Sequence, residues 1–186
     1  MDFNYHGHLR DRHAFLSASK YHWIRYDEEK LANSFITQMA AQRGTELHAH
    51  AAEAIRLGIK QRQTKQTFNM YVNDALGYRM SPEVILHYSD NAFGTADTIS
   101  FHKNLLRIHD LKTGVSKTSF DQLMIYAAFF CLEYGFKPPT IGMELRIYQN
   151  DATEVFNPDP DQIVHIMDKI VTFDRKINEL RVGVNR

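Results

Sequence analysis

The pattern of apolar and polar residues changes in character along this chain. In the first half, polar and apolar helix-forming residues are mixed, with few β-branched runs. This pattern favours helices near 28–43, 45–57 and 65–79. We expect Gly44 and Gly58 to break the helical region, because glycine is a common helix terminator. The first half therefore predicts a largely helical segment.

The middle of the chain has short apolar runs of a different kind. They are rich in β-branched and aromatic residues and are separated by polar turns. Such runs are typical of strands. The three predicted strands are 83–88, 93–101 and 105–113.

The last third returns to helix, then strand, then helix. A helix is expected at 119–134, because Gly135 and a pair of prolines follow it. Two strands are expected at 140–149 and 153–156. A final helix at 161–180 starts beside a proline, and its apolar positions near helical spacing predict that it covers the core through Ile163, Ile166, Ile170, Phe173 and Ile177.

This order of elements predicts an α/β (α+β) fold, with a central mixed sheet of about five strands flanked by helices. At 186 residues, with no repeat and no linker-like stretch, the chain is expected to form a single domain, 1–186. Within it, the helical N-terminal part covers about 16–80, the sheet and its helix about 82–150, and the C-terminal helix about 161–180.

The composition is that of a globular protein. Hydrophobic residues make up 44% of the chain and charged residues 24%, as in globular proteins. No apolar stretch is long enough for a membrane helix, and the polar N-terminus lacks the apolar region of a secretory signal. We therefore expect a cytoplasmic protein without membrane contact. Cys131 is the single cysteine, which excludes an internal disulfide and a four-cysteine cluster.

The formal net charge is zero. Proteins that coat nucleic acid through phosphate contacts are usually basic, so this value gives no support for that class. An enzyme that holds nucleic acid in a local groove remains compatible with it.

Candidate chemistry lies in the segment 93–114. If Lys103 and Asn104 form a two-residue turn, facing residues have numbers that sum to 207. Side chains alternate along a strand, so three facing pairs share one face, and Lys112 points to the same face. The pairs are Phe101–Leu106, Ile99–Ile108 and Asp97–Asp110.

Two aspartates placed opposite each other destabilise a sheet unless their charge is compensated. Either one carboxylate is protonated or a cation bridges Asp97 and Asp110. A hard divalent ion such as Mg²⁺ or Mn²⁺ suits oxygen ligands. The ammonium of Lys112 can then orient water or stabilise charge on a phosphate.

Four sequence blocks accompany these residues in order: GTELH at 44–48, GTAD at 94–97, HDLKTG at 109–114 and QLMIY at 122–126. Together with a weaker match, LSAS at 16–19, they resemble the RecB-like branch of the PD-(D/E)XK nuclease superfamily. This branch includes CRISPR-associated RecB-like exonucleases and many small phage nucleases. The resemblance covers about 16–150 and implies a restriction-endonuclease-like core.

Matched position by position, the resemblance implies that His48, Asp97 and Asp110 bind the metal, with the backbone carbonyl of Leu111 as a further ligand. It implies that Lys112 is the catalytic lysine. The family hydrolyses phosphodiesters with a metal-activated water and leaves 5′-phosphates.

Two residues of the last block, Gln122 and Tyr126, lie one helical turn apart on one face. The resemblance implies that they lie beside the site and contact DNA or the lysine. Glu83 has two interpretations: it helps to bind a second metal, or it is simply exposed.

The choice of histidine stays open on periodicity alone. On a helix over 45–57 the apolar stripe leaves His48 and His50 on opposite borders. The glycine-to-histidine spacing of the family favours His48 as the ligand, with His50 as the alternative.

The resemblance implies a Mg²⁺- or Mn²⁺-dependent DNA exonuclease without an iron–sulfur cluster, since Cys131 alone cannot hold one. A small stand-alone, phage-type nuclease is expected, working in recombination, repair or genome processing, and in the host cytoplasm if a phage encodes it. DNA is the expected substrate, and recombination or replication proteins are candidate partners. The alternatives are a structure-specific or restriction-like endonuclease, and a non-catalytic nuclease-fold module that binds DNA or protein.

Overall fold

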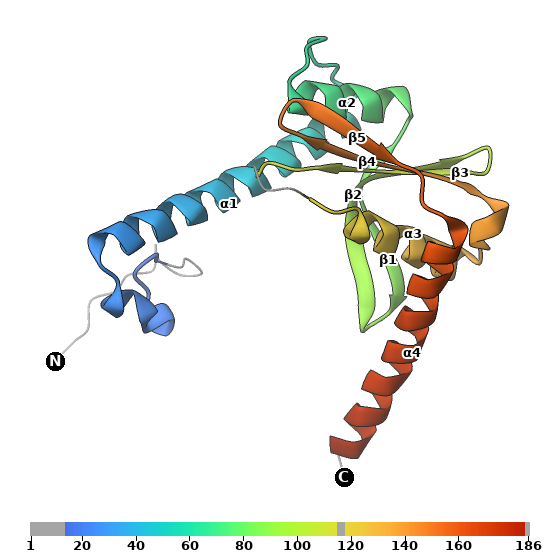
Figure 1. Cartoon of the computed structure of the whole chain (residues 1–186). Coiled ribbons are helices and arrows are strands. Elements are labelled where there is room, and N and C mark those ends of the chain that lie inside the picture. The colour runs from blue at the N-terminus through green and yellow to red at the C-terminus, as the bar shows by residue number, and fades with distance from the viewer. Residues whose placement is uncertain (1–13, 115–117, 185–186) are drawn as a thin grey trace. The chain divides into compact units, whose positions relative to one another are not determined.

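The computed structural model describes residues 14–114 and 118–184 (Figure 1). The chain divides into two compact units, one ending at Arg43 and the other beginning at Gly44. Helix α1 (Glu28–Arg56) contributes residues to both. Each unit is described by itself.

The N-terminal unit contains the 3₁₀ segment η2 (Ala18–Arg25), which is kinked at Lys20, and the first half of α1. Asp27 caps α1, since its carboxylate accepts the backbone N–H of Lys30 at 2.7 Å. The indole of Trp23 donates to the carbonyl of Ser17 at 2.9 Å. Both hydrogen bonds join residues that are close in sequence.

The second unit is an α+β domain built on a five-stranded mixed sheet, which confirms the predicted fold class. The sheet follows chain order, and only the β3–β4 pair is parallel. The strands are β1 (Ser81–Ser89), β2 (Ala92–His102), β3 (Leu105–Leu111), β4 (Gly142–Gln149) and β5 (Ala152–Phe156). The parallel pair requires a crossover, which consists of α3 (Asp121–Tyr134) and the short η3 (Pro138–Thr140).

Two apolar clusters lie on opposite faces of the sheet. The larger one packs α3 and the start of α4 (Pro160–Val184) against β1 to β4. The smaller one packs α2 (Thr67–Gly77) and the end of α1 against Leu111 and Tyr148. Figure 1 shows α2 and α3 on the two sides of β3 to β5. The sheet end that carries the candidate residues is thus held from both faces.

Several element boundaries differ from the sequence predictions. The predicted break at Gly44 is wrong, because α1 runs through it without interruption. Gly44 is buried there, and a Cβ would lie 2.8 Å from Oγ1 of Thr113, so the helix needs its smallest residue at this contact. The breaks at Gly58 and Gly135 are confirmed, and both have φ near +70°.

The final helix is longer than predicted, and only its first half covers the core. Ile163 is fully buried, and Ile166 and Ile170 pack beside it. Phe173 is 61% exposed and Ile177 38% exposed, so the prediction that they cover the core is wrong. Among the described residues, no helix has the length and apolarity that a membrane span requires.

Candidate functional site

The β2–β3 hairpin has the predicted register. Thr98 pairs with His109 and Phe101 with Leu106, so facing numbers sum to 207. Lys103 and Asn104 have φ of 51° and 58°, as a two-residue turn with two left-handed residues requires. The turn therefore fixes which residues reach the far end of the hairpin.

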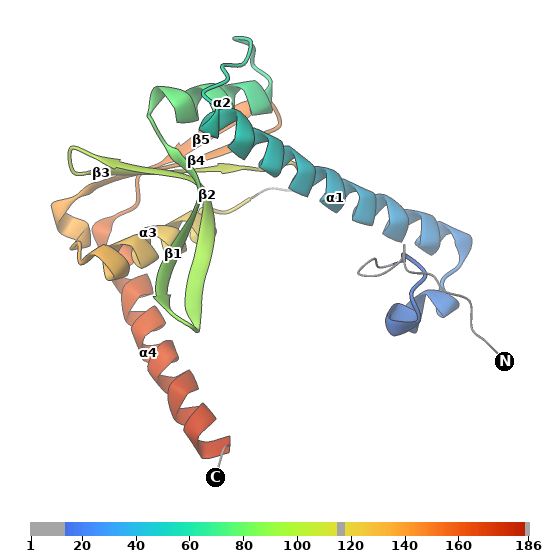
Figure 2. The same ribbon diagram turned by 180° about the vertical axis from the view of Figure 1, so that it is seen from behind.

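Strand β2 changes face around Asp97. Ala96 and Ile99 belong to the same apolar cluster although they are three residues apart, which regular alternation does not allow. The recorded β2–β3 pairing ends at Thr98, and β1–β2 pairing continues from there towards Ala92. Figure 2 shows the β1–β2 hairpin bending away from β3 to β5. Asp97 lies at this bend, where the sheet opens.

The Asp97 carboxylate replaces the missing ladder contact. Its Oδ2 accepts the backbone N–H of Leu111 at 3.0 Å and lies 3.2 Å from Nδ1 of His48. The hydrogen bond to Asp97 raises the pKa of His48 above 6.5, against the opposing effect of burial. An imidazole on α1 and an amide on β3 therefore meet one carboxylate on β2.

Asp110 is the buried carboxylate of the site, with its side chain only 4% exposed. Burial is the largest cause that raises its pKa, and the charge of Asp97 adds to it, while Lys112 opposes both. Lys112 Nζ donates to Oδ1 at 3.1 Å. Oδ2 is 3.0 Å from the same nitrogen, yet it lies outside hydrogen-bond geometry and has no hydrogen-bond partner. The attraction to Lys112 therefore compensates Asp110 only in part.

Lys112 also connects the hairpin to α3. Its Nζ donates to Oε1 of Gln122 at 2.8 Å, and Nε2 of Gln122 donates to the Tyr126 hydroxyl at 3.1 Å. A Cβ on Gly94 would lie 2.9 Å from the Tyr126 ring. The ring thus packs directly on the backbone of β2. Gly94, from the second sequence block, is needed there because any side chain would collide with the ring.

The structure separates the two histidine candidates. His48 contacts Asp97, as described above, whereas His50 stacks on Phe68 with ring centroids 5.3 Å apart. Glu83 lies on β1 between the residues that pair with Thr98 and Ala96, but its carboxylate binds Arg56 at 2.7 Å. The geometry therefore brings His48 into the cluster and directs Glu83 to another partner.

The backbone of Leu111 also faces the cluster. Lys112 N–H donates to the carbonyl of Tyr148 on β4, so the polar groups of Leu111 point to the other side of β3. That side carries Asp97, which takes the Leu111 N–H. Because the Leu111 carbonyl belongs to the same peptide plane as the Lys112 N–H and points opposite to it, it also faces the β2 side.

Sequence reasoning missed one residue under this site. Tyr71 of α2 is 2% exposed, and burial raises its pKa well above 10.0, with the Asp97 charge adding to the effect. Its hydroxyl hydrogen-bonds Thr98, next to Asp97. No local pattern signals this contact, because Tyr71 and Asp97 are joined only by the packing of α2 on the sheet.

The donor set fits a hard divalent cation in its chemistry. It combines one imidazole, two carboxylates and a backbone carbonyl. Oδ2 of Asp110 is buried without a hydrogen bond, and Oδ1 of Asp97 makes none with a described residue. In the described part of the chain, however, no three His, Cys, Asp or Glu side chains form a ready group of ligands. The contact between His48 and Asp97 joins Nδ1 to Oδ2, so it leaves Nε2 of His48 and Oδ1 of Asp97 outside this contact.

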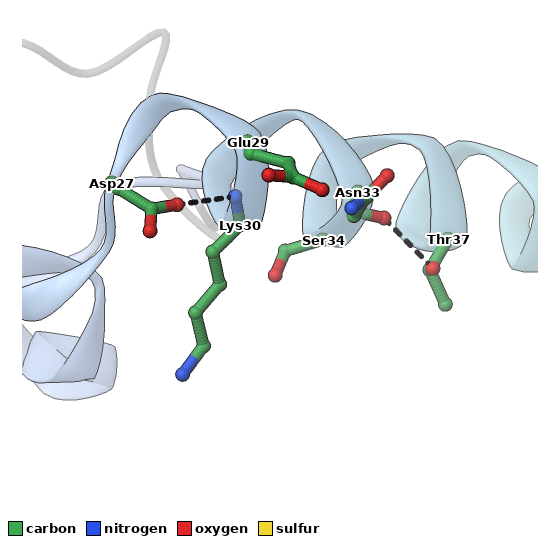
Figure 3. A pocket seen from close by; sticks show the side chains of 6 residues that line it. All are labelled: Asp27, Glu29, Lys30, Asn33, Ser34 and Thr37. Atoms are coloured by element: carbon green, nitrogen blue, oxygen red, sulfur yellow. Dashed lines mark hydrogen bonds between the residues drawn. The ribbon is translucent and has the colours of Figure 1, made fainter.

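A hollow on the first turns of α1 lies in the N-terminal unit. Figure 3 shows its lining: Asp27, Glu29, Lys30, Asn33, Ser34 and Thr37. The hydrogen bonds drawn there serve the helix itself, since Asp27 caps it and Thr37 donates to the carbonyl of Asn33. These contacts indicate helix capping rather than a reactive group.

Comparisons with family models, with curated proteins and with solved structures found no match to this chain. The function is therefore inferred from the geometry of the cluster and from the sequence blocks.

Proposed function

We propose that this protein is a divalent-metal-dependent DNA exonuclease that hydrolyses phosphodiester bonds and leaves 5′-phosphates. The observation that carries the proposal is the meeting of Asp97, Asp110 and Lys112 at the bend of β2, with His48 against the same carboxylate. The order of the sequence blocks supports it, because each block contributes a residue to this one cluster. The proposed compartment is the cytoplasm.

The proposal assigns the metal to His48, Asp97, Asp110 and the carbonyl of Leu111, with Mg²⁺ or Mn²⁺ as the expected ion. When bound, such an ion supplies Lewis-acid chemistry, which favours deprotonation of water and offsets negative charge on a phosphate.

Lys112 has the position for a role in the reaction itself. Gln122 and Asp110 hold its ammonium between them at 2.8 and about 3 Å. A cation fixed by two partners stabilises negative charge without reorganising during the reaction. The Gln122–Tyr126 pair keeps the side chain of Gln122 in place and borders the space next to Lys112.

His48 on α1 and Asp97 on β2 form a hydrogen-bonded pair that affects the charge of the imidazole. The Asp97 carboxylate holds His48 by a hydrogen bond, and the raised pKa of His48 shows that the pair favours a protonated imidazole. Metal ligation needs the neutral imidazole. Metal binding and protonation therefore compete for the His48 side chain.

The test is a digestion with Mg²⁺ or Mn²⁺ of linear, nicked, closed circular and single-stranded DNA. We expect linear DNA with free ends to be degraded to short 5′-phosphorylated products while closed circles survive. Cleavage of closed circles would replace the exonuclease with an endonuclease. No cleavage of any nucleic acid over a full metal titration would favour a binding module.

The control variants separate chemistry from folding. Asp110→Asn keeps the shape of the buried side chain and should abolish cleavage. Lys169→Ala removes an exposed lysine on α4 that has no ion pair with a described residue, and should leave cleavage unchanged. Full activity in Asp110→Asn would refute the assignment of the site.

A further inference from the structure

A second polar hollow, of about 520 Å³, lies between the C-terminal end of α2, the start of β1 and the β2–β3 turn. Its size is in the range of ligand pockets. None of its lining residues is acidic. Six of them carry the argument: Tyr78, Arg79, Ser81, Ser100, His102 and Arg107. The polar groups that an anion meets in this hollow include two arginines and the hydroxyls of two serines, beside the apolar surface of Phe101.

Arg107 is held in place with part of its guanidinium free. Its Nε donates to Oε1 of Glu144 at 3.0 Å, and its guanidinium lies 4.4 Å from the centre of the Tyr78 ring. Its two terminal nitrogens make no hydrogen bond with any residue that the structure describes. A fixed, planar pair of donors is the geometry that matches a phosphate.

The local charge is in excess on the positive side. Glu144, the partner of Arg107, also accepts two contacts from Arg146 at 3.1 Å. The side chain of Arg79 makes no ion pair or hydrogen bond within 14–114 and 118–184. Arg146 also pairs with Asp74 at 3.2 Å, so two carboxylates balance Arg107 and Arg146, and the positive excess comes from Arg79.

The helix end beside the hollow does not cancel this charge. The C-terminus of a helix usually presents carbonyl oxygens, which repel anions. At this end of α2, the carbonyls of Asp74, Ala75 and Leu76 each accept one backbone N–H, donated by the three residues that follow the helix. These three carbonyls are therefore already hydrogen-bonded. The hydroxyls of Ser81 and Ser100 make no hydrogen bond with described residues and remain available as donors.

We propose that this hollow binds a phosphate group of the polynucleotide away from the bond that is cut. The choice of a polynucleotide rests on the proposed function, whereas the phosphate chemistry rests on the hollow alone. Ser100 follows Asp97 by three residues on β2, which is about 10 Å of strand. One DNA strand in a duplex rises about 3.4 Å per nucleotide, so about three nucleotides of a duplex cover this length.

The test measures binding of a labelled single-stranded oligonucleotide of about 20 nucleotides by fluorescence anisotropy, in EDTA and over a series of salt concentrations. Arg79→Gln should weaken binding and reduce the slope of log K against log salt by about 0.7, the value for one phosphate contact on a single strand. Arg62→Gln removes another exposed arginine and should match the wild type. Arg107→Lys keeps the charge but loses the planar donors, and should weaken binding with the slope unchanged.

A second arm titrates inorganic phosphate by calorimetry into the wild type and Arg79→Gln. Phosphate binding that is lost in Arg79→Gln, with oligonucleotide binding unaltered, would overturn the polynucleotide as the source of the phosphate. Wild-type oligonucleotide binding by Arg79→Gln and Arg107→Lys, together with wild-type phosphate binding by Arg79→Gln, would overturn the site itself. Reduced slopes in a protein that never cleaves DNA would support the hollow while the proposed function fails.

Discussion

The ion pair of Lys112 with Asp110 permits a test on stability alone, through the variant Lys112→Met. Methionine keeps much of the side-chain volume but leaves Asp110 without its cation. The Asp110 side chain is 4% exposed and that of Lys112 is 27% exposed. Removing one partner of a fully buried pair costs roughly 3–5 kcal/mol. Because water already reaches Lys112, we expect a loss of about 2–3 kcal/mol near neutral pH.

The loss should depend on pH with a defined sign. Burial and Asp97 raise the pKa of Asp110 above 3.8 in the folded state, and removing Lys112 raises it further. A pKa that is raised in the folded state stabilises the fold at pH values below the pKa of the unfolded state. This contribution is lost as the pH rises through the pKa of the folded state. The deficit of Lys112→Met should therefore be small near pH 4 and full near pH 8.

The assay is urea unfolding of wild type, Lys112→Met and Lys169→Met in EDTA at both pH values. Asp110→Asn combined with Lys112→Met should recover most of the lost stability, because no buried charge remains. An equal deficit of Lys112→Met at both pH values would refute the reasoning, since packing loss alone does not titrate.

Three further outcomes follow from the site. Gly94→Ala should lower cleavage severalfold while the fold persists, because the new Cβ would lie 2.9 Å from the Tyr126 ring and would displace it. Cleavage assays measure the activity, and circular dichroism checks the fold. His48→Gln should abolish metal-dependent cleavage and His50→Gln should not, because only His48 reaches the cluster. Asp97→Asn should lower the pKa of His48 towards 6.5, measured by proton NMR of the imidazole, since the hydrogen bond to Asp97 is the main cause of its raised value.

Controls for these outcomes exist in the chain. Lys169→Ala changes an exposed position on α4, so it should retain full activity. An unchanged rate in Gly94→Ala would contradict the role of the Tyr126 contact. Loss of cleavage in His50→Gln, or an unaltered His48 pKa in Asp97→Asn, would contradict the geometry of the cluster.

Local turn chemistry made much of the site predictable. The Lys103–Asn104 turn fixes the register of the hairpin, and with it the positions of Ile99 against Ile108 and of Asp110 near Asp97. Gly135 ends α3 as expected, because it adopts a left-handed φ of 71°. These features depend on residues close in sequence, which is why the pattern indicates them.

Features that depend on distant packing were not predictable. The bend of β2 at Asp97, the turn of its carboxylate to Leu111 N–H and the pairing of Glu83 with Arg56 all arise between elements. The paired aspartates predicted a proton or a cation that compensates their charge. In the structure, His48 and Lys112 provide part of that compensation.

The central claim is that Asp110 and its neighbours hold a divalent cation, and a calorimetric titration of Mn²⁺ tests it most directly. The wild type and Asp110→Asn are compared at the same pH without nucleic acid. We expect saturable binding in the wild type and its loss in Asp110→Asn. Equal Mn²⁺ affinity in the two proteins would contradict the claim.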